Sequence, residues 1–282
     1  MKSNNFGTLF LVSTPIGNLK DITLRAIETL SNVDIIVCEN PSSSLKLLNT
    51  LNIKNKKLIQ LNAIIERKNT SNIISILKQG KNIAYISDAG TPLISDPGNI
   101  LVNDCINNEI NISPIPGANA ILPALIGSGI NSDDFTFIGF LSNKKSTKTK
   151  QIKQLLQYKN TIIFYESSHR INETLEILKE VFPKDNKICI ARELTKLHEE
   201  YIRDTISNIT LTDEQSKGEF VIVLEAANLE NQSCETLSDE NILNKLKDLI
   251  ANNKLSKKEA IKQISKEYNI SKNKVYSISL KI

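Results

Sequence analysis

Residues 83–98 read IAYISDAGTPLISDPG and carry the clearest structural pattern in the sequence. The run IAYIS is apolar and rich in β-forming residues, which predicts a short buried strand. Gly90 and Pro92 end that strand, because glycine permits unusual backbone angles and proline lacks an N–H donor. Asp96 followed by Pro97 predicts an N-cap and the first residue of a helix. A crevice is therefore expected at the carboxyl end of a parallel strand, where open α/β sheets bind ligands.

Two carboxylates, Asp88 and Asp96, lie in this predicted loop. Phosphate sites prefer bare N–H groups and positive charge, so a loop with two acids suits a cationic or hydroxyl-rich ligand better. Asp88 is expected to contact that ligand, although a turn residue that bonds its own backbone has the same pattern. For Asp96, capping of the following helix explains the residue equally well.

Strands alternate with helices on both sides of this loop. Apolar runs at 9–12, 33–37, 57–61 and 110–115 predict strands. Asp21 is expected to cap a helix that has Leu24, Ile27 and Leu30 on one face. This alternation predicts a parallel sheet with right-handed crossovers. The pattern breaks at Pro116-Gly117, so a first domain is predicted at residues 1–116.

The second half predicts a mixed sheet with helices, in a domain spanning residues 117–228. Its strands are expected at 135–141, 161–165, 188–191, 201–206 and 220–224. A polar linker at 229–235 precedes a basic helical extension at 236–282. In that extension Ser256 and Glu259 form a capping box, and Ser271 opens another helix, which suggests a helix-turn-helix-like unit.

The totals fit two domains plus an extension in 282 residues. A net charge of +4 is weak evidence for an anionic partner in a chain so rich in Asn, Lys and Ile. The four cysteines lack a C-x-x-C pair and there are only two histidines, so free thiols and no metal site are expected. Neither a membrane helix nor a signal peptide is expected, which predicts a soluble, cytoplasmic protein.

Seven short motifs are spaced along the chain. They read STPIGNL at 13–19, SDAGTP at 87–92, SDPG at 95–98, PGA at 116–118, FYESSHR at 164–170, ARELTK at 191–196 and KGEF at 217–220. In order and spacing they resemble the tetrapyrrole-methylase class of S-adenosylmethionine enzymes. Within that class they resemble the bacterial family that methylates a cytidine ribose 2′-hydroxyl in small-subunit ribosomal RNA.

The resemblance implies two α/β domains with S-adenosylmethionine in the cleft between them, usually in a homodimer. The implied partner is small-subunit rRNA or the assembled small ribosomal subunit. The motif residues expected at the cofactor are Pro15, Asp88, Ala89, Gly90, Thr91, Asp96, Gly117, Phe164, Tyr165 and Arg192. Arg192 pairing with Glu193 is an equally good reading of that motif.

The reaction needs alignment of the methyl donor and a group that accepts the hydroxyl proton. Glu166, at the end of a strand, is the first candidate for this base, and His169 is the alternative. Arg170 suits a phosphate because its guanidinium is a planar fork. The basic loop at 142–150, with Lys144, Lys145 and Lys148, is expected to face RNA phosphates, unless it is simply a mobile polar loop.

Two stretches depart from the family pattern. Glu39-Asn40-Pro41-Ser42 stands where the family usually has Glu-Asp-Thr-Arg, and residues 62–66 keep only an Asn and a Glu of a His/Asn/Glu cluster. These departures leave a non-catalytic ribosome-binding relative as an alternative. A tetrapyrrole or other small-molecule methylase is a second alternative, and the basic loop and tail argue against it.

Overall fold

The computed structural model describes residues 5–227, 239–251, 255–268 and 271–281. The chain divides into two compact units, residues 1–226 and 227–282. The predicted linker at 229–235, Cys234 and the turn at 269–270 lie outside the described residues. Within the described residues no helix combines the length and apolar character needed to cross a bilayer.

The first sheet has five parallel strands in the order β3-β2-β4-β1-β5, as the alternating pattern predicts. Its strands are β1 (Leu9–Val12), β2 (Ile35–Cys38), β3 (Lys57–Gln60), β4 (Ile83–Ile86) and β5 (Ile112–Ile115). The helices between them are α1 (Leu24–Asn32), α2 (Pro41–Thr50), α3 (Glu66–Lys78) and α4 (Asn99–Asn107), after a short 3-10 turn η1 (Leu19–Asp21).

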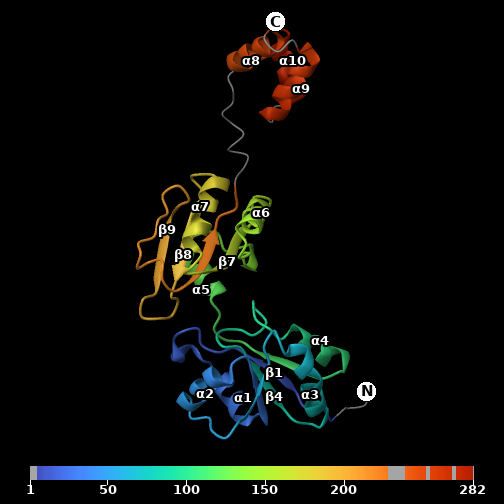
Figure 1. Cartoon of the computed structure of the whole chain (residues 1–282), viewed down its shortest axis with the longest axis vertical. Coiled ribbons are helices and arrows are strands. Elements are labelled where there is room, and N and C mark those ends of the chain that lie inside the picture. Colours follow the sequence, from blue (N-terminus) through green and yellow to red (C-terminus); the bar gives the residue numbers. More distant parts are fainter. Residues whose placement is uncertain (1–4, 228–238, 252–254, 269–270, 282) are drawn as a thin grey trace. The chain divides into compact units, whose positions relative to one another are not determined.

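The buried central strand β4 is confirmed, and Figure 1 shows it inside the first sheet. Its side chains alternate between two cores. Ile83 and Tyr85 pack with α3 and α4, whereas Ala84 and Ile86 pack with α1 and α2. A strand covered on both faces must be apolar throughout, and this explains the uninterrupted run IAYI.

The second sheet is mixed, as predicted, with the order β6-β7-β10-β8-β9. Only β6 and β7 are parallel; the other pairs are antiparallel. Its strands are β6 (Phe135–Phe140), β7 (Thr161–Ser167), β8 (Lys187–Arg192), β9 (Glu200–Thr205) and β10 (Glu219–Leu224). Helices α5 (Ile121–Ser128), α6 (Lys145–Leu155) and α7 (Ile171–Val181) belong to the same half of the unit, and α5 packs against β8, β9 and β10.

The C-terminal unit contains α8 (Asp239–Ala251), α9 (Lys257–Glu267) and α10 (Lys272–Ser279) around an apolar core of its own. The capping box of Ser256 and Glu259 is confirmed, and Ser271 caps α10 by accepting the Lys274 N–H. Ala260, Ile264 and Val275 are buried in the core.

Two local predictions were wrong. The cap of α1 is Thr23, which accepts the Ala26 N–H, because Asp21 lies in the 3-10 turn before it. The expected basic loop at 142–150 is mostly the start of α6. Its helical spacing is hidden in the sequence because a lysine, Lys148, occupies the inner face together with Ile152 and Leu155.

Candidate functional site

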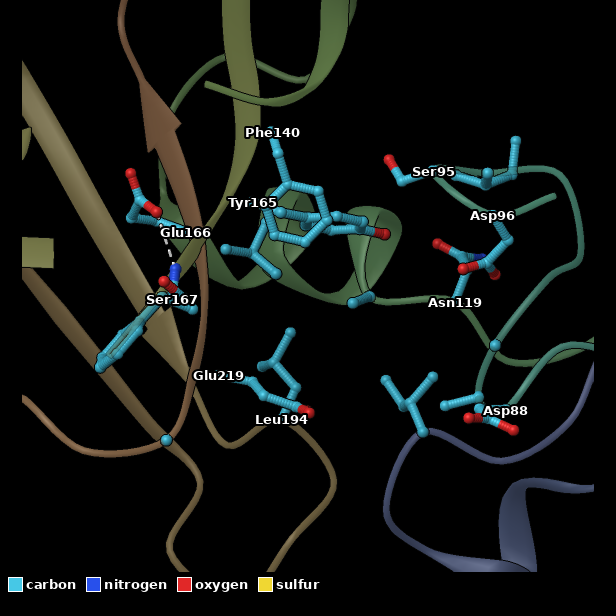
Figure 2. A pocket seen from close by; sticks show the side chains of 18 of the residues that line it. Asp88, Ser95, Asp96, Asn119, Phe140, Tyr165, Glu166, Ser167, Leu194 and Glu219 are labelled. Carbon is cyan, nitrogen blue, oxygen red and sulfur yellow. Dashed lines mark hydrogen bonds between the residues drawn. The ribbon is translucent and has the colours of Figure 1, made fainter. Parts of the chain in front are cut away.

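A cavity of about 490 Å³ opens beside the loop that follows β4 (Figure 2). One side is formed by residues of the first sheet's loops and the other by β7, β10 and the turn after β8. Its lining includes Ile16, Asp88, Ala89, Gly90, Thr91, Ile94, Ser95, Asp96, Asn119, Ala120, Phe140, Tyr165, Glu166, Ser167, Ser168, Leu194, Gly218, Glu219, Phe220 and Val221. Ligand sites at the carboxyl ends of parallel strands have this position.

The loop after β4 is bonded to the neighbouring loops as well as within its own turn. Gly90 forms a two-way backbone bridge with Thr14 in the loop after β1. The Thr91 hydroxyl donates to the Ala118 carbonyl at 3.1 Å and lies 2.9 Å from the Ser13 hydroxyl. The three loops of 13–19, 87–92 and 116–118 are therefore tied together at the floor of the cavity.

Asp96 does not cap α4, so that prediction was wrong. The cap comes from Glu66 at the start of α3, whose Oε1 accepts the N–H groups of Gly98, Ile100 and Leu101 at 3.0, 2.8 and 3.3 Å. The Tyr85 hydroxyl also donates to the Pro97 carbonyl at 2.7 Å. Because Glu66 satisfies the N–H groups at the start of α4, the Asp96 side chain is not needed as a cap. It lines the cavity and accepts a hydrogen bond from Ser87.

The same loop contains strained backbone. Leu93 and Ser95 have φ values of 72° and 68°, in the left-handed region that disfavours residues other than glycine. Such strain persists only where the surroundings impose it, and it is concentrated at ligand-binding sites. Beside this strained backbone, the Leu93 side chain packs against the core cluster that contains Tyr85.

Three carboxyl groups near this loop share an unfavourable environment. Burial raises the pKa of Asp96 and of Asp88 above the ordinary 3.8, and the Asp88 charge raises that of Asp96 further. Burial also raises the pKa of Glu39 above 4.5, with added repulsion from Asp96 and Asp88. The described residues supply no salt-bridge partner for any of the three. A ligand that donates hydrogen bonds or carries positive charge would relieve this repulsion.

Glu166 has the opposite surroundings. Its Oε1 accepts from the Ser167 N–H at 2.8 Å and from Arg170 at 2.6 Å, and its Oε2 accepts from the Thr174 hydroxyl at 2.7 Å. The side chain is fully buried, and Figure 2 shows its carboxylate turned toward Ser167 and away from Asp96. Both oxygens are occupied, so Glu166 is poorly placed to accept a proton from a ligand.

Arg170 is also committed to the protein. Besides Glu166, its guanidinium donates to the Leu141 carbonyl at 3.0 Å and to the Asn143 side chain. Glu166 and Arg170 thus form a brace that holds the segment after β6. A phosphate would have to displace these partners.

The structure divides the predicted cofactor residues into two groups. Asp88, Ala89, Gly90, Thr91, Asp96 and Tyr165 line the main cavity. Pro15 lines a smaller cavity of about 190 Å³ that shares Asp88 with it, and Gly117 packs where a Cβ would lie 2.9 Å from the Ser13 Cβ. Phe164 is fully buried in the sheet, and Arg192 pairs with Glu200 at 3.0 Å rather than with Glu193. Neither of these last two lines the cavity.

The other predicted groups separate in the same way. Lys144 and Lys145 are exposed. The Lys148 side chain is fully buried and its ammonium lies 2.7 Å from Glu173, so the prediction that Lys148 contacts an RNA phosphate was wrong. His169 is exposed and does not line the cavity. Asn40 and Pro41, in the stretch that departs from the family, cap and begin α2.

Sequence reasoning missed Phe140, Asn119 and Leu194 as lining residues. Leu194 belongs to the motif ARELTK, which was a usable signal. The sequence held no comparable signal for Phe140, because the direction of its side chain depends on an irregularity in the pairing of β6 with β7. In the described part of the chain, no group of three or more His, Cys, Asp or Glu side chains is arranged to hold a metal ion.

The model of the tetrapyrrole (corrin/porphyrin) methylases matches residues 8–210. The chain belongs to this family. Near full-length relatives of this tetrapyrrole methylase are named ribosomal RNA small subunit methyltransferase I. The Bacillus subtilis protein is 42% identical over 97% of this chain and 94% of its own length. The Synechocystis protein is 39% identical over 98% of both, and the Haemophilus influenzae protein is 41% identical over 97% and 96%.

Solved structures agree on the fold. Uroporphyrin-III-C-methyltransferase from Thermus thermophilus has a TM-score of 0.55 and 16% identity over 80% of this chain and 98% of its own. The methyltransferase CobJ has a TM-score of 0.59 and 19% identity over 78% and 95%. These structures and the two observed sheets confirm the predicted pair of α/β parts, and the observed helices α8, α9 and α10 confirm the predicted helical C-terminal part.

Proposed function

We propose that this chain uses S-adenosylmethionine to methylate small-subunit ribosomal RNA, and that the acceptor is the ribose 2′-hydroxyl of a cytidine. The observation that carries the proposal is the near full-length match, at about 40% identity, to relatives named ribosomal RNA small subunit methyltransferase I. The cavity alone would not choose among the substrates of a methylase family, because function resides in the site rather than in the fold.

The cavity suits this cofactor. Its volume of about 490 Å³ is in the range of small-molecule sites. Ile16, Ala120, Leu194 and Val221 offer an apolar wall for an aromatic base, and Asp88 and Asn119 offer polar groups for hydroxyl and ammonium groups. Asp88 and Asp96 have raised pKa values and no salt-bridge partner among the described residues, and they fit a ligand that is positively charged at its sulfonium and amino groups.

S-adenosylmethionine, when bound, supplies an activated methyl group. The remaining tasks are to align the acceptor hydroxyl and to take its proton. We assign the proton to Asp96, because it lines the cavity, its carboxylate has no salt-bridge partner in the described part of the chain, and burial raises its pKa. A carboxylate with a raised pKa is a stronger base than an ordinary aspartate. Glu166 becomes a positioning residue in this scheme.

RNA binding is assigned to the exposed side chains of Lys144 and Lys145 at the start of α6. Phosphate contacts of this kind give affinity without reading sequence. Arg170 supports these lysines indirectly by holding the preceding segment. We also propose that the chain acts on the assembled small subunit as a homodimer, which sedimentation with and without subunits would test.

The test is methyl transfer from labelled S-adenosylmethionine to small ribosomal subunits that lack the modification. The product is digested, and the methylated nucleoside is located by mass spectrometry. A single 2′-O-methylcytidine is expected. Label on a base, on another ribose, or only on an added porphyrin would contradict the proposal.

A lack of transfer is informative only with two controls. The subunits must accept methyl groups from a known enzyme of this activity, and the chain must bind S-adenosylmethionine by calorimetry. If both hold and no transfer occurs, the chain is a ribosome-binding relative without turnover.

A further inference from the structure

Phe140, at the end of β6, presents an exposed aromatic ring to the cavity. Its exposed fraction is 52%, whereas Phe220 in the same lining is 2% exposed. Figure 2 shows the ring beside Tyr165 and across the cavity from Ser95 and Asp96. An aromatic side chain left half open inside a ligand cavity calls for an explanation, because burial would stabilise the fold.

A β-bulge aims the ring in this direction. Phe137 pairs with Ile163 and Phe140 with Tyr165, so three steps on β6 match two on β7. Side chains alternate along a strand, and without the extra residue Phe140 would point to the opposite face from Phe137. With it, both rings contact Tyr165 edge to face, at centroid distances of 4.8 and 5.3 Å. Gly139, with φ 71°, absorbs the irregularity.

The bulge also requires a close approach across the cavity. A Cβ at Gly139 would lie 3.3 Å from the Ser95 hydroxyl, so a larger residue would push against the loop that carries Asp96. Burial raises the pKa of Tyr165, and the Asp96 charge raises it further, which agrees with a carboxylate near the aromatic pair. The exposed ring and the proposed base therefore face the same space.

The chain continues from Phe140 directly into the cationic segment. The Leu141 carbonyl and the Asn143 side chain are held by Arg170, and Arg170 is held by the buried Glu166. The exposed Lys144 and Lys145 follow within five residues. An aromatic face followed by cations on a braced segment is how proteins bind an unpaired nucleotide and its phosphates.

We propose that Phe140 is a base-binding residue: the pyrimidine of the target nucleotide stacks on its ring, which places the attached ribose toward Asp96. The target base must leave its own stack to enter the cavity, and a stacking surface offsets part of that cost. This inference rests on the proposed function and adds the site for the base. The adenine of the cofactor is the competing occupant, and it is assigned instead to the apolar wall around Leu194.

The test compares full-length Phe140→Ala, Phe140→Tyr and Phe140→Leu with the wild type. Loss of one aromatic stacking partner lowers affinity by about tenfold or more. Phe140→Ala and Phe140→Leu are therefore expected to raise KM for small subunits by about that factor, while Phe140→Tyr stays near wild type. The Kd for S-adenosylmethionine, measured by calorimetry, is expected to change less than about twofold in all three.

Phe135→Ala is the matched control, because Phe135 is a 37% exposed phenylalanine on the same strand and outside the cavity lining. It should leave KM unchanged. The proposal is overturned if Phe140→Ala transfers methyl groups as the wild type does, if Phe140→Leu keeps wild-type KM, or if the main loss is in cofactor affinity. An inactive wild type would overturn the proposed function itself, and this inference with it.

Discussion

The acidic side chains in and near the two sides of the cavity have opposite surroundings. On the side of the first sheet, Glu39, Asp88 and Asp96 have pKa values raised by burial, and no described residue forms a salt bridge with them. On the side of the second sheet, each glutamate has a cationic partner: Glu166 pairs with Arg170, Glu193 with Lys196, and Glu200 with Arg192. Hydrogen bonds from Gln215 and Arg192 lower the pKa of Glu200.

This difference separates ligand binding from support. A carboxylate with its hydrogen bonds satisfied by the protein stabilises the shape of the site but has little left for a ligand. A desolvated, unpaired carboxylate destabilises the empty site and gains most when a ligand arrives. Glu166, which the sequence suggested first as the general base, has its oxygens bonded by the protein and supports the shape of the site. Asp96 is desolvated and is the carboxylate that gains most from a ligand.

The largest effect is expected where the supporting side is broken. Glu166→Ala leaves Arg170 without its partner in a mostly buried position, and loss of one member of a buried pair costs about 3–5 kcal/mol. Urea denaturation should show this drop in the free energy of unfolding. The control is Glu176→Ala, because Glu176 is exposed and pairs with Lys179 at the surface. Its loss should lower the free energy of unfolding by less than about 1 kcal/mol. Equal stabilities of the two variants would show that the brace is not structural.

Asp96→Asn tests the ligand side, with the opposite outcome for stability. The rate of methyl transfer should fall by about 100-fold, as for loss of a general base. The free energy of unfolding at neutral pH should not fall. Because the folded-state pKa of Asp96 is raised, its charged form disfavours the fold above that pKa, and removing the charge costs no stability.

The pH profile sharpens this second test. In the wild type, kcat/KM should decrease on acidification through a pKa above 3.8, the ordinary value for aspartate, because the base must be ionised and kcat/KM reports the pKa of the free enzyme. The residual activity of Asp96→Asn should not show this decrease at acidic pH. A variant that keeps the wild-type profile would assign the proton to another group.

Glu66→Ala is expected to affect both the support of the site and its binding of the ligand. It removes a cap from α4 and support from the loop of Asp96, and a lost cap costs about 1–2 kcal/mol of stability. Both the free energy of unfolding and the affinity for S-adenosylmethionine should fall, whereas Glu66→Gln should retain part of each through its side-chain oxygen. A loss of affinity with unchanged stability would instead place Glu66 at the ligand.

The smallest effect concerns the lysines of α6. Replacing Lys144 and Lys145 with Ala should reduce the slope of log affinity for RNA against log salt by about 1.4, since each phosphate contact contributes about 0.7 for single strands. Lys148→Met is the matched control, because its ammonium is buried against Glu173. It should change stability without changing the slope. An unaltered slope in the double variant would remove these lysines from the RNA surface.

Local pattern and motif spacing were enough for much of this molecule. The run IAYI predicted the central strand, the alternation of elements predicted the parallel sheet, and SDAGTP marked the loop at the cavity. These features depend on residues adjacent in sequence, so periodicity and turn chemistry record them. The caps of α9 and α10 were predictable for the same reason.

The roles of single side chains depended on partners far away in the chain. Asp96-Pro97 has the sequence of a helix start, yet the cap is Glu66, which is 30 residues earlier. Lys148 looks like a phosphate contact until its burial against α7 is seen, and Phe140 is aimed by an extra residue against β7. By itself, the sequence determined the elements, their order and the motif loops. Only the tertiary structure decided which charges are satisfied by the protein and which remain for a ligand, because pairing and desolvation depend on distance in space.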